Sequence, residues 1–219
     1  MPDLPEEATA ATADVGLAPA ALAAPVRKRP RPGERRVQIL QTLAAMLEQP
    51  GAERITTAAL AAKLDVSEAA LYRHFSSKAQ MFEGLIEFIE SSVFTLVNQI
   101  TEREGDGRLQ AQKIAVMLLQ FGEKNPGMTR VMVGDALVFE HERLIARMNQ
   151  FFDRVESQLR QCLRSVAEAA GSATPTVDAN VLASAITSMI VGRLQRYARS
   201  GFKRLPTEQV DLALQRLTS

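Results

Sequence analysis

Residues 55–78, ITTAALAAKLDVSEAALYRHFSSK, decide the fold of this chain. Apolar residues recur at helical spacing in their first half, at Leu60, Ala61 and Leu64. This spacing predicts a short helix with one buried stripe that begins near Thr57. Thr56 or Thr57 is the expected N-cap, because a threonine hydroxyl can accept a hydrogen bond from a backbone N–H that has no partner inside the helix.

The second half of the stretch predicts a tight turn and another helix. Asp65 and Val66 interrupt the apolar period, and Ser67 followed by Glu68 is a typical helix start. Three residues of this second helix should lie inward: Ala70, Leu71 and Phe75. The outward face then carries Ser67, Ala69, Tyr72, Arg73 and His74. Small residues let a helix approach DNA closely and long polar ones reach bases and phosphates, so this face favours a helix-turn-helix that docks in the major groove.

The predicted DNA contacts divide into two groups. The residues expected to read bases, or to position the recognition helix on them, are Thr57, Ser67, Ala69, Tyr72 and Arg73. Phosphates are expected to be contacted by Thr56, His74 and Lys78. A solvated helical hairpin with no DNA role is the alternative, because such hairpins are common in helical bundles. His74 could equally pack against the first helix.

The same residues carry a resemblance to a known family. The run formed by Leu60, Ala61, Val66, Ser67, Leu71, Tyr72, His74, Phe75 and Lys78 resembles the DNA-binding signature of the TetR family of dimeric bacterial regulators. Asp65 stands where that signature has a glycine. Because aspartate tolerates a left-handed backbone, the turn can survive.

One branch of the TetR family, which acts in nucleoid occlusion, is more similar still. SEAALYRHF at 67–75, MFEGLIEFIE at 81–90 and FGEKNPG at 121–127 resemble that branch, and the similarity covers about residues 35–206. It implies a DNA-bound factor that inhibits ring assembly by FtsZ, the tubulin-like division protein, over the nucleoid. Partner-binding residues would then include Phe88, Lys124 and Asn125, although Phe88 could be core. Leu96 and Gln120 differ from the branch.

A ligand-responsive TetR-type repressor is the alternative function. His141, Glu142 and Arg193 could line an inducer pocket in the C-terminal domain, or His141 and Glu142 could simply face water. Catalysis is not expected, because the sequence has no phosphate loop, no nucleophile–base constellation and no metal motif. The two histidines, His74 and His141, lie too far apart in sequence for a metal site. No cofactor is expected.

Composition predicts an all-α protein. The chain has 219 residues, 46% apolar residues, 5% aromatic residues and no tryptophan, and its frequent alanine, leucine, glutamate and arginine favour helix. No strand is predicted. Cys162 lies in an apolar helical stripe, so we expect a buried thiol in a reducing compartment. No segment approaches the roughly 18 apolar residues of a membrane span, and a cytoplasmic location is expected.

The net charge of +1 hides a segregation along the chain. The charged residues among 1–26 are all acidic, and the segment is interpreted as part of a flexible tail, residues 1–33. A basic arm follows, formed by Arg27, Lys28, Arg29, Arg31, Arg35 and Arg36. It could add salt-dependent phosphate or minor-groove contacts, or it could be a solvated linker.

The remaining pattern completes an N-terminal three-helix helix-turn-helix domain (34–78) and a C-terminal helical dimerisation bundle with partner-binding function (79–219). Helices are predicted at 33–48, 78–104, 108–123, 128–133, 136–170, 177–200 and 206–217. Helix 78–104 is apolar on more than one face, so it should couple the domains. The segment 136–170 has a near-3.5 period typical of coiled coils, and with 177–200 and their symmetry mates it predicts a four-helix homodimer interface. A homodimer would bind a pseudo-palindromic site in double-stranded DNA.

Overall fold

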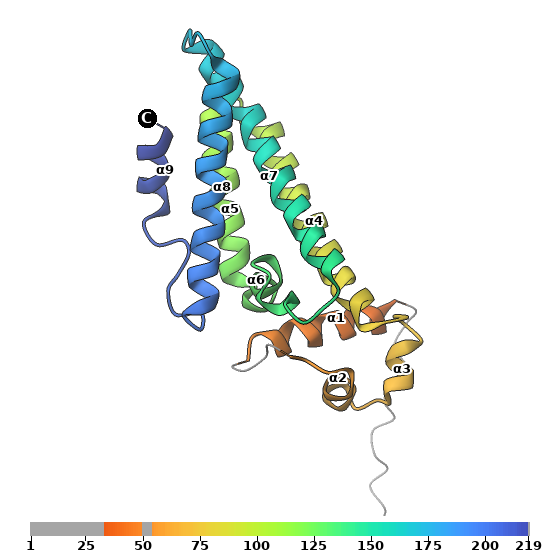
Figure 1. Cartoon of the computed structure of the whole chain (residues 1–219). Helices are drawn as coiled ribbons and strands as arrows, with labels where there is room; N and C mark the ends of the chain where they lie inside the picture. The colour runs from red at the N-terminus through yellow and green to blue at the C-terminus, as the bar shows by residue number, and fades with distance from the viewer. Residues whose placement is uncertain (1–32, 50–53, 219) are drawn as a thin grey trace, which may run out of the picture.

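The computed structural model describes residues 33–49 and 54–218, and this part of the chain is helical without a strand (Figure 1). The elements in order are α1 (Glu34–Leu47), α2 (Thr57–Leu64), α3 (Glu68–Tyr72), α4 (Lys78–Arg103), α5 (Gly107–Lys124), α6 (Pro126–Met132), the 3-10 helix η1 (Asp135–Leu137), α7 (Glu142–Ala169), α8 (Pro175–Arg199) and α9 (Val210–Thr218). The predicted all-α fold is confirmed. The tail and four residues of the basic arm, Arg27, Lys28, Arg29 and Arg31, lie outside the described residues.

The helix-turn-helix is built by local capping. The side chains of Thr56 and Ser67 accept hydrogen bonds from the N–H groups of Ala59 and Ala70, at 3.1 and 3.3 Å, and so start α2 and α3. Asp65 ends α2 with φ 55° and ψ 50°, which is the left-handed conformation predicted for it. The caps and the turn therefore fix the angle between two helices that are too short to be stable alone.

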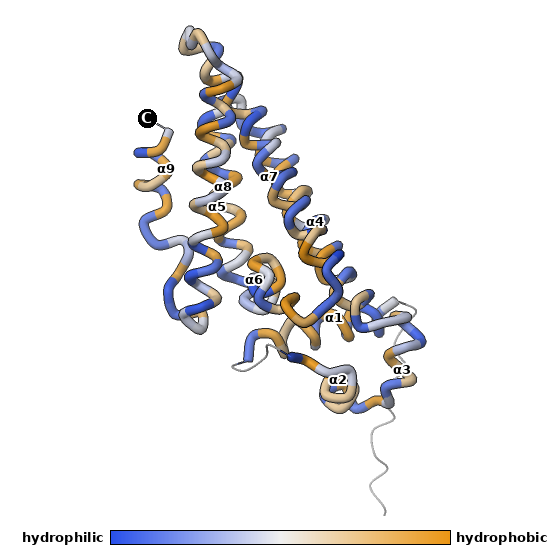
Figure 2. The backbone as a smooth tube through the Cα atoms, in the orientation of Figure 1, coloured by the Kyte–Doolittle hydropathy of each residue, from blue (hydrophilic) through white to orange (hydrophobic). Residues whose placement is uncertain are grey.

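α4 joins the helix-turn-helix to the bundle, as its pattern predicts. Ser77 caps it by accepting from the N–H of Gln80 at 3.2 Å. Most of its apolar residues between Met81 and Val97 are buried, and the helix contacts α1 at one end and α5, α6 and α7 farther along. Figure 2 shows hydrophobic stretches along α4. Any rotation of α4 would therefore change contacts in both the helix-turn-helix and the bundle.

The bundle is formed mainly by α5, α7 and α8, with α4 packed on α5 and α7, and α9 on the outside against α5 and α8 (Figure 1). A glycine allows two of these helices to pack in direct backbone contact. A Cβ on Gly107 would lie 2.2 Å from the carbonyl oxygen of Cys162, so α5 touches the backbone of α7. Cys162 itself is buried as predicted, and desolvation raises the pKa of its thiol.

α6 packs just as closely on α1. A Cβ on Gly127 would lie 2.0 Å from the carbonyl oxygen of Ala44. Since α6 also contacts α5 and α8, it connects α1 to the bundle core. The FGEKNPG segment thus has a packing role in addition to ending α5.

Some predicted bounds are wrong. A continuous helix from Ala136 does not exist: Asp135–Leu137 is a 3-10 helix, and α7 begins only at Glu142, after His141 accepts the N–H of Arg143 at 3.3 Å. The last helix begins at Val210 rather than Pro206, because Gln209 has a left-handed φ of 52°. α6 begins two residues earlier than predicted, at Pro126, where the ring's fixed φ suits a first helical turn.

The sequence analysis predicted no segment long and apolar enough for a membrane span, and α8 corrects this prediction. Within the described residues it is long and apolar enough to cross a membrane, with a mean hydropathy of 1.2 over 18 residues, of which 33% are buried. A bundle helix passes the same test, and α8 supplies Ala183, Ile186, Ile190 and Leu194 to the core. The division of the chain at residues 33 and 78 stays a prediction.

Candidate nucleic-acid interface

The predicted recognition face is exposed on α3 and its flanks. Leu71 and Phe75 are each 1% exposed and hold α3 on the core. Facing solvent are Ser67, Ala69, Tyr72, Arg73 and His74, and Tyr72 is 45% exposed. The small side chains lie toward the start of the helix and the long polar ones at its end. This arrangement suits a helix that inserts into a groove and reaches base edges and phosphates.

The two threonines at the start of α2 are already engaged within the protein. Thr56 is the N-cap of α2, while Thr57 Oγ1 donates to Glu68 Oε2 at 2.5 Å and ties α2 to α3. Their predicted DNA roles remain predictions. The N-cap role of Thr56 was one of the two predicted alternatives. The hydrogen bond between Thr57 and Glu68 was not predicted.

The structure changes the interpretation of Arg36 and His74. Arg36 lies in α1, where its guanidinium stacks 4.1 Å from the Phe75 ring centroid and Nη1 donates to the carbonyl oxygen of His74 at 3.0 Å. It therefore fastens the end of the recognition segment and does not extend a free arm. The His74 side chain is exposed, so it does not pack against the first helix. Arg35, the other arm residue in α1, bonds Gln38.

Lys78 has a partner that the sequence analysis missed. Its Nζ donates to Glu140 Oε1, and the two side chains are 26% and 9% exposed. Glu140 lies 62 residues away, in the segment between η1 and α7, so no local pattern indicates the contact. The predicted phosphate contact of Lys78 stays a prediction, and Glu140 already occupies the same ammonium group.

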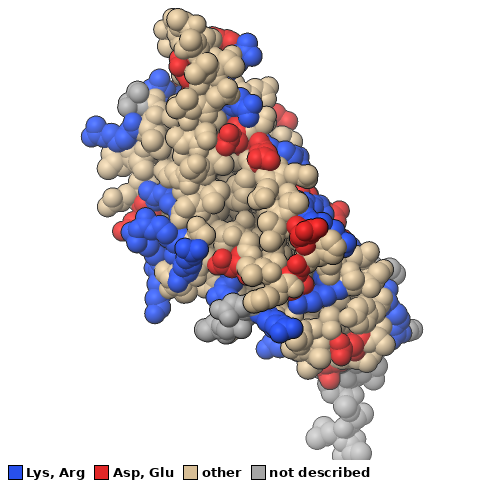
Figure 3. Space-filling model, viewed as in Figure 1, with Lys and Arg blue, Asp and Glu red and all other residues tan. Residues whose placement is uncertain are grey.

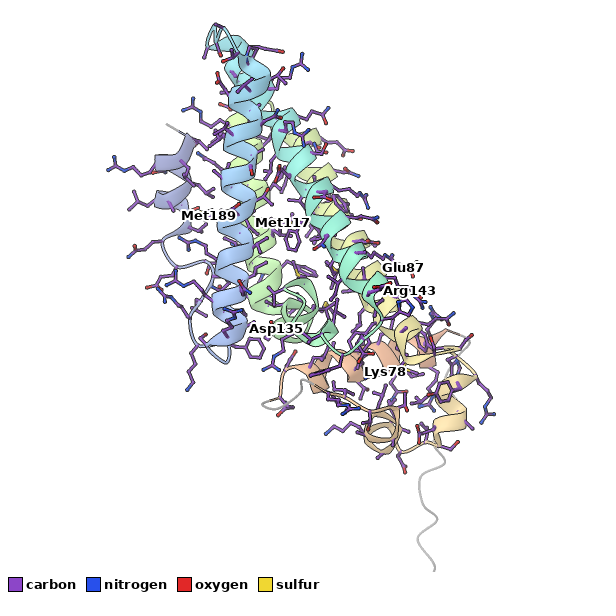
Figure 4. All side chains as sticks on the ribbon, in the orientation of Figure 1. Lys78, Glu87, Met117, Asp135, Arg143 and Met189 are labelled. Atoms are coloured by element: carbon purple, nitrogen blue, oxygen red, sulfur yellow. The ribbon has the colours of Figure 1, made fainter. Side chains whose placement is uncertain are left out.

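Further ion pairs continue the contact between α4 and α7. Glu83 accepts from Arg143 at 2.7 Å, and Glu90 accepts from Arg147 at 2.6 Å. The hydrogen bond to Glu90 raises the pKa of Arg147. Figure 4 shows Lys78 at the helix-turn-helix end of α4 and Arg143 beside Glu87 farther along. We call this series, with Lys78–Glu140, the α4–α7 seam.

The residues predicted to bind a protein partner lie on α4 and at the end of α5. Phe88 is 50% exposed, so the interpretation that it belongs to the core is wrong. Lys124 is exposed, and the Asn125 side chain donates to the carbonyl oxygen of Phe121 at 2.7 Å where α5 ends. Leu96, one of the departures from the branch, is 38% exposed on α4. The exposed phenyl ring is the feature of this set that fits a protein contact best.

The residues predicted for an inducer pocket do not come together. His141 caps α7, Glu142 is exposed at its first turn, and Arg193 donates to the carbonyl oxygens of Pro206 and Glu208 at 3.0 and 2.7 Å. Arg193 lines an open pocket of about 260 Å³ whose walls are mostly arginine and the 204–209 segment. Within the described part of the chain, no group of three or more His, Cys, Asp or Glu side chains could hold a metal ion.

Family models match both parts of the chain. The model described as bacterial regulatory proteins of the tetR family covers residues 39–85, and the one described as the tetracyclin repressor-like C-terminal domain covers residues 106–219. Solved structures agree on the fold. The fatty acid degradation regulator FadR from Bacillus halodurans superposes with a TM-score of 0.70 at 14% identity, over 85% of this chain and 96% of that one. The fold and the helix-turn-helix together define a TetR-type DNA-binding regulator.

Curated relatives narrow this class. "Nucleoid occlusion factor SlmA" from Photobacterium profundum is 53% identical over 178 residues, which is 81% of this chain and 90% of that protein. The same factor from Vibrio cholerae is 52% identical over the same shares. The chain belongs to the SlmA nucleoid occlusion factors of the TetR family. The relatives that match are named as nucleoid occlusion factors, and the N-terminal family model is described as bacterial regulatory proteins.

Proposed function

We propose that this protein binds dispersed pseudo-palindromic sites on the chromosome through α3 and, while bound, inhibits FtsZ ring assembly over the nucleoid. It would act in the cytoplasm, on the nucleoid surface. The observation that carries the proposal is the exposed Tyr72–Arg73 face on a capped, well-packed α3, in a chain 53% identical to a nucleoid occlusion factor.

A twofold dimer would bind a two-part DNA site. Two copies of α3 related by a twofold axis meet successive major grooves about 34 Å apart, so each protomer reads half of a pseudo-palindrome. Arg73 and Tyr72 can reach base edges, and Ser67 and Ala69 leave room for close approach. Many dispersed sites, in contrast to one operator, are what a factor that marks the whole nucleoid needs.

The FtsZ contact is assigned to α4 and the end of α5. Phe88 presents a half-exposed ring on the helix that also connects to the DNA-binding unit, and Lys124 adds a positive charge on the bundle. An exposed aromatic ring and an exposed lysine would fit a partner segment that has both apolar and acidic residues. Because α4 contacts both α1 and α7, a partner on α4 would be sensitive to DNA.

A chromosome-wide binding map is the first test. Many sites that avoid the replication terminus and ignore promoters support the proposal, whereas one or a few sites at promoters would identify a repressor. FtsZ is tested separately by Lys124→Glu, which should weaken binding to purified FtsZ and leave DNA affinity unchanged. Arg108→Glu on the same helix is the control, since Arg108 is also exposed and lies at the opposite end of α5. Unchanged inhibition of FtsZ assembly by Lys124→Glu would remove this residue from the contact.

A further inference from the structure

Lys78 occupies the position on α4 that is nearest to the recognition helix. It is the first residue of α4, directly after the Ser77 cap, and five positions beyond Arg73. The N-terminus of a helix of 26 residues favours anions, because its N–H dipoles add to the lysine charge. A DNA phosphate beside α3 would therefore be drawn to the same ammonium that Glu140 now holds.

We propose that Glu140 is an internal competitor of the DNA backbone for Lys78, and that it sets the DNA affinity of this protein. The proposal rests on the proposed phosphate contact of Lys78. Lysine has three donors and could in principle hold both acceptors. Even so, a carboxylate and a phosphate on one ammonium repel each other, so Glu140 lowers DNA affinity whether or not it leaves.

The segment that carries Glu140 has exposed apolar side chains between two fixed ends. Leu137 is 0% exposed and anchors its start, and His141 caps α7 at its end. Between them Val138 and Phe139 are 63% and 67% exposed. A shift of Glu140 consequently disturbs little buried apolar area.

The competition would also couple DNA to the bundle. Glu140 is the end of the α4–α7 seam nearest to the recognition helix, and Glu83–Arg143 and Glu90–Arg147 hold the rest of that seam. DNA that draws Lys78 away loosens only this end. Linkage is reciprocal for binding, so any partner that shifts the Glu140 segment would change DNA affinity by the same factor.

The experiment measures binding of the full-length dimer to a fluorescein-labelled duplex that carries the strongest site of the chromosome map, by anisotropy at low salt. Glu140→Gln should bind about five- to tenfold more tightly than the wild type. Lys78→Met should bind more weakly, with a salt slope smaller by about one. In the Lys78→Met background, Glu140→Gln should have no further effect, since there is no ammonium left to compete for.

A matched control separates competition from general charge. Glu142→Gln removes the same formal charge two residues away, from an exposed position in the first turn of α7. It should change affinity by less than about twofold at this screened distance. Thermal unfolding of each variant checks that Glu140→Gln, which keeps a hydrogen-bond acceptor, retains the fold.

Two results would overturn the proposal. One is wild-type affinity for Glu140→Gln; the other is an equal gain in the presence and absence of Lys78. If Arg73→Ala loses specific binding while Lys78→Met does not, the DNA function stands and the competition is refuted. If the wild-type protein shows no preference for the mapped site over a scrambled duplex, the proposed DNA function itself fails.

Discussion

The outward faces of α3 and α8 differ in chemistry. α3 and its flanking residues present a tyrosine, an arginine and a histidine beside two small residues. α8 presents Val177, Val181, Ser184 and Ser188 to solvent, with the half-buried Gly192 one turn farther along. Val177 and Val181 are 56% and 67% exposed, and a Cβ on Gly192 would meet nothing within 4 Å. Figure 3 shows uncharged residues over the upper and middle part of α8 and basic residues gathered near its lower end.

The chemistry of each face indicates the kind of partner that it would bind. A polar face with long donors is well solvated alone and gains by meeting phosphates and base edges. An apolar, small-residue face gains by close packing against another helix. The contrast assigns the polyanion to α3 and the second protomer to α8, with α7 beside it, and the following predictions test that assignment.

Val181→Glu should have the largest effect. A charge on this face would be buried against the symmetry mate, so the dimer should dissociate and specific DNA affinity should fall by about 100-fold or more because only one half-site remains bound. Sedimentation velocity measures the oligomer and anisotropy measures the affinity. The control is Leu212→Glu on α9, where the leucine is likewise exposed, at 54%. A dimer that survives Val181→Glu but not Leu212→Glu would move the interface to α9.

Arg73→Ala should weaken specific DNA binding by about 10- to 100-fold and leave the dimer intact, because it removes a base or phosphate contact and no packing. Tyr72→Ala should act in the same direction. Arg164→Ala is a matched loss of an exposed arginine on α7, far along the chain from α3. Equal affinity of Arg73→Ala and Arg164→Ala would remove Arg73 from the recognition face.

Gly127→Ala tests the joint between the two regions. A Cβ there would lie 2.0 Å from the Ala44 carbonyl oxygen, so α6 must move away from α1. We expect a loss of about 1–3 kcal/mol in the free energy of unfolding, the usual cost of overpacking. Denaturant titration measures it. Gly105→Ala, where nothing lies within 4 Å, should be nearly neutral, and equal losses would mean that the close α1–α6 contact is unimportant.

Local signals made much of this fold predictable. Threonine and serine caps at Thr56 and Ser67 mark helix starts within a few residues, and the structure confirms both. The outward face of α3 follows from helical periodicity alone. These features depend on neighbours in the sequence, which is why a single sequence contains them.

Contacts between distant residues could not be predicted in this way. Arg36 was assigned to an arm because it follows a basic run, yet it bonds His74, 38 residues away. Lys78 was predicted to contact a phosphate from its place at the start of a helix, and no local pattern indicates its ion pair with Glu140, 62 residues away. The helix predicted from Ala136 is wrong because Leu137 and Leu144, both buried and seven residues apart, keep the apolar period across the break at residues 138–141.

The smallest predicted effect lies in the turn that aims α3. Asp65 has a φ of 55°, which a β-branched residue adopts only with strain. Asp65→Val should therefore lower the free energy of unfolding by about 1–2 kcal/mol, while Asp65→Gly should be neutral or stabilising by a few tenths. Because the turn sets the angle of α3 and leaves α8 untouched, Asp65→Val should also weaken DNA binding at an unchanged dimer constant. Thermal unfolding, anisotropy and sedimentation on one preparation separate these effects, and a shifted dimer constant would show that the two faces are not independent.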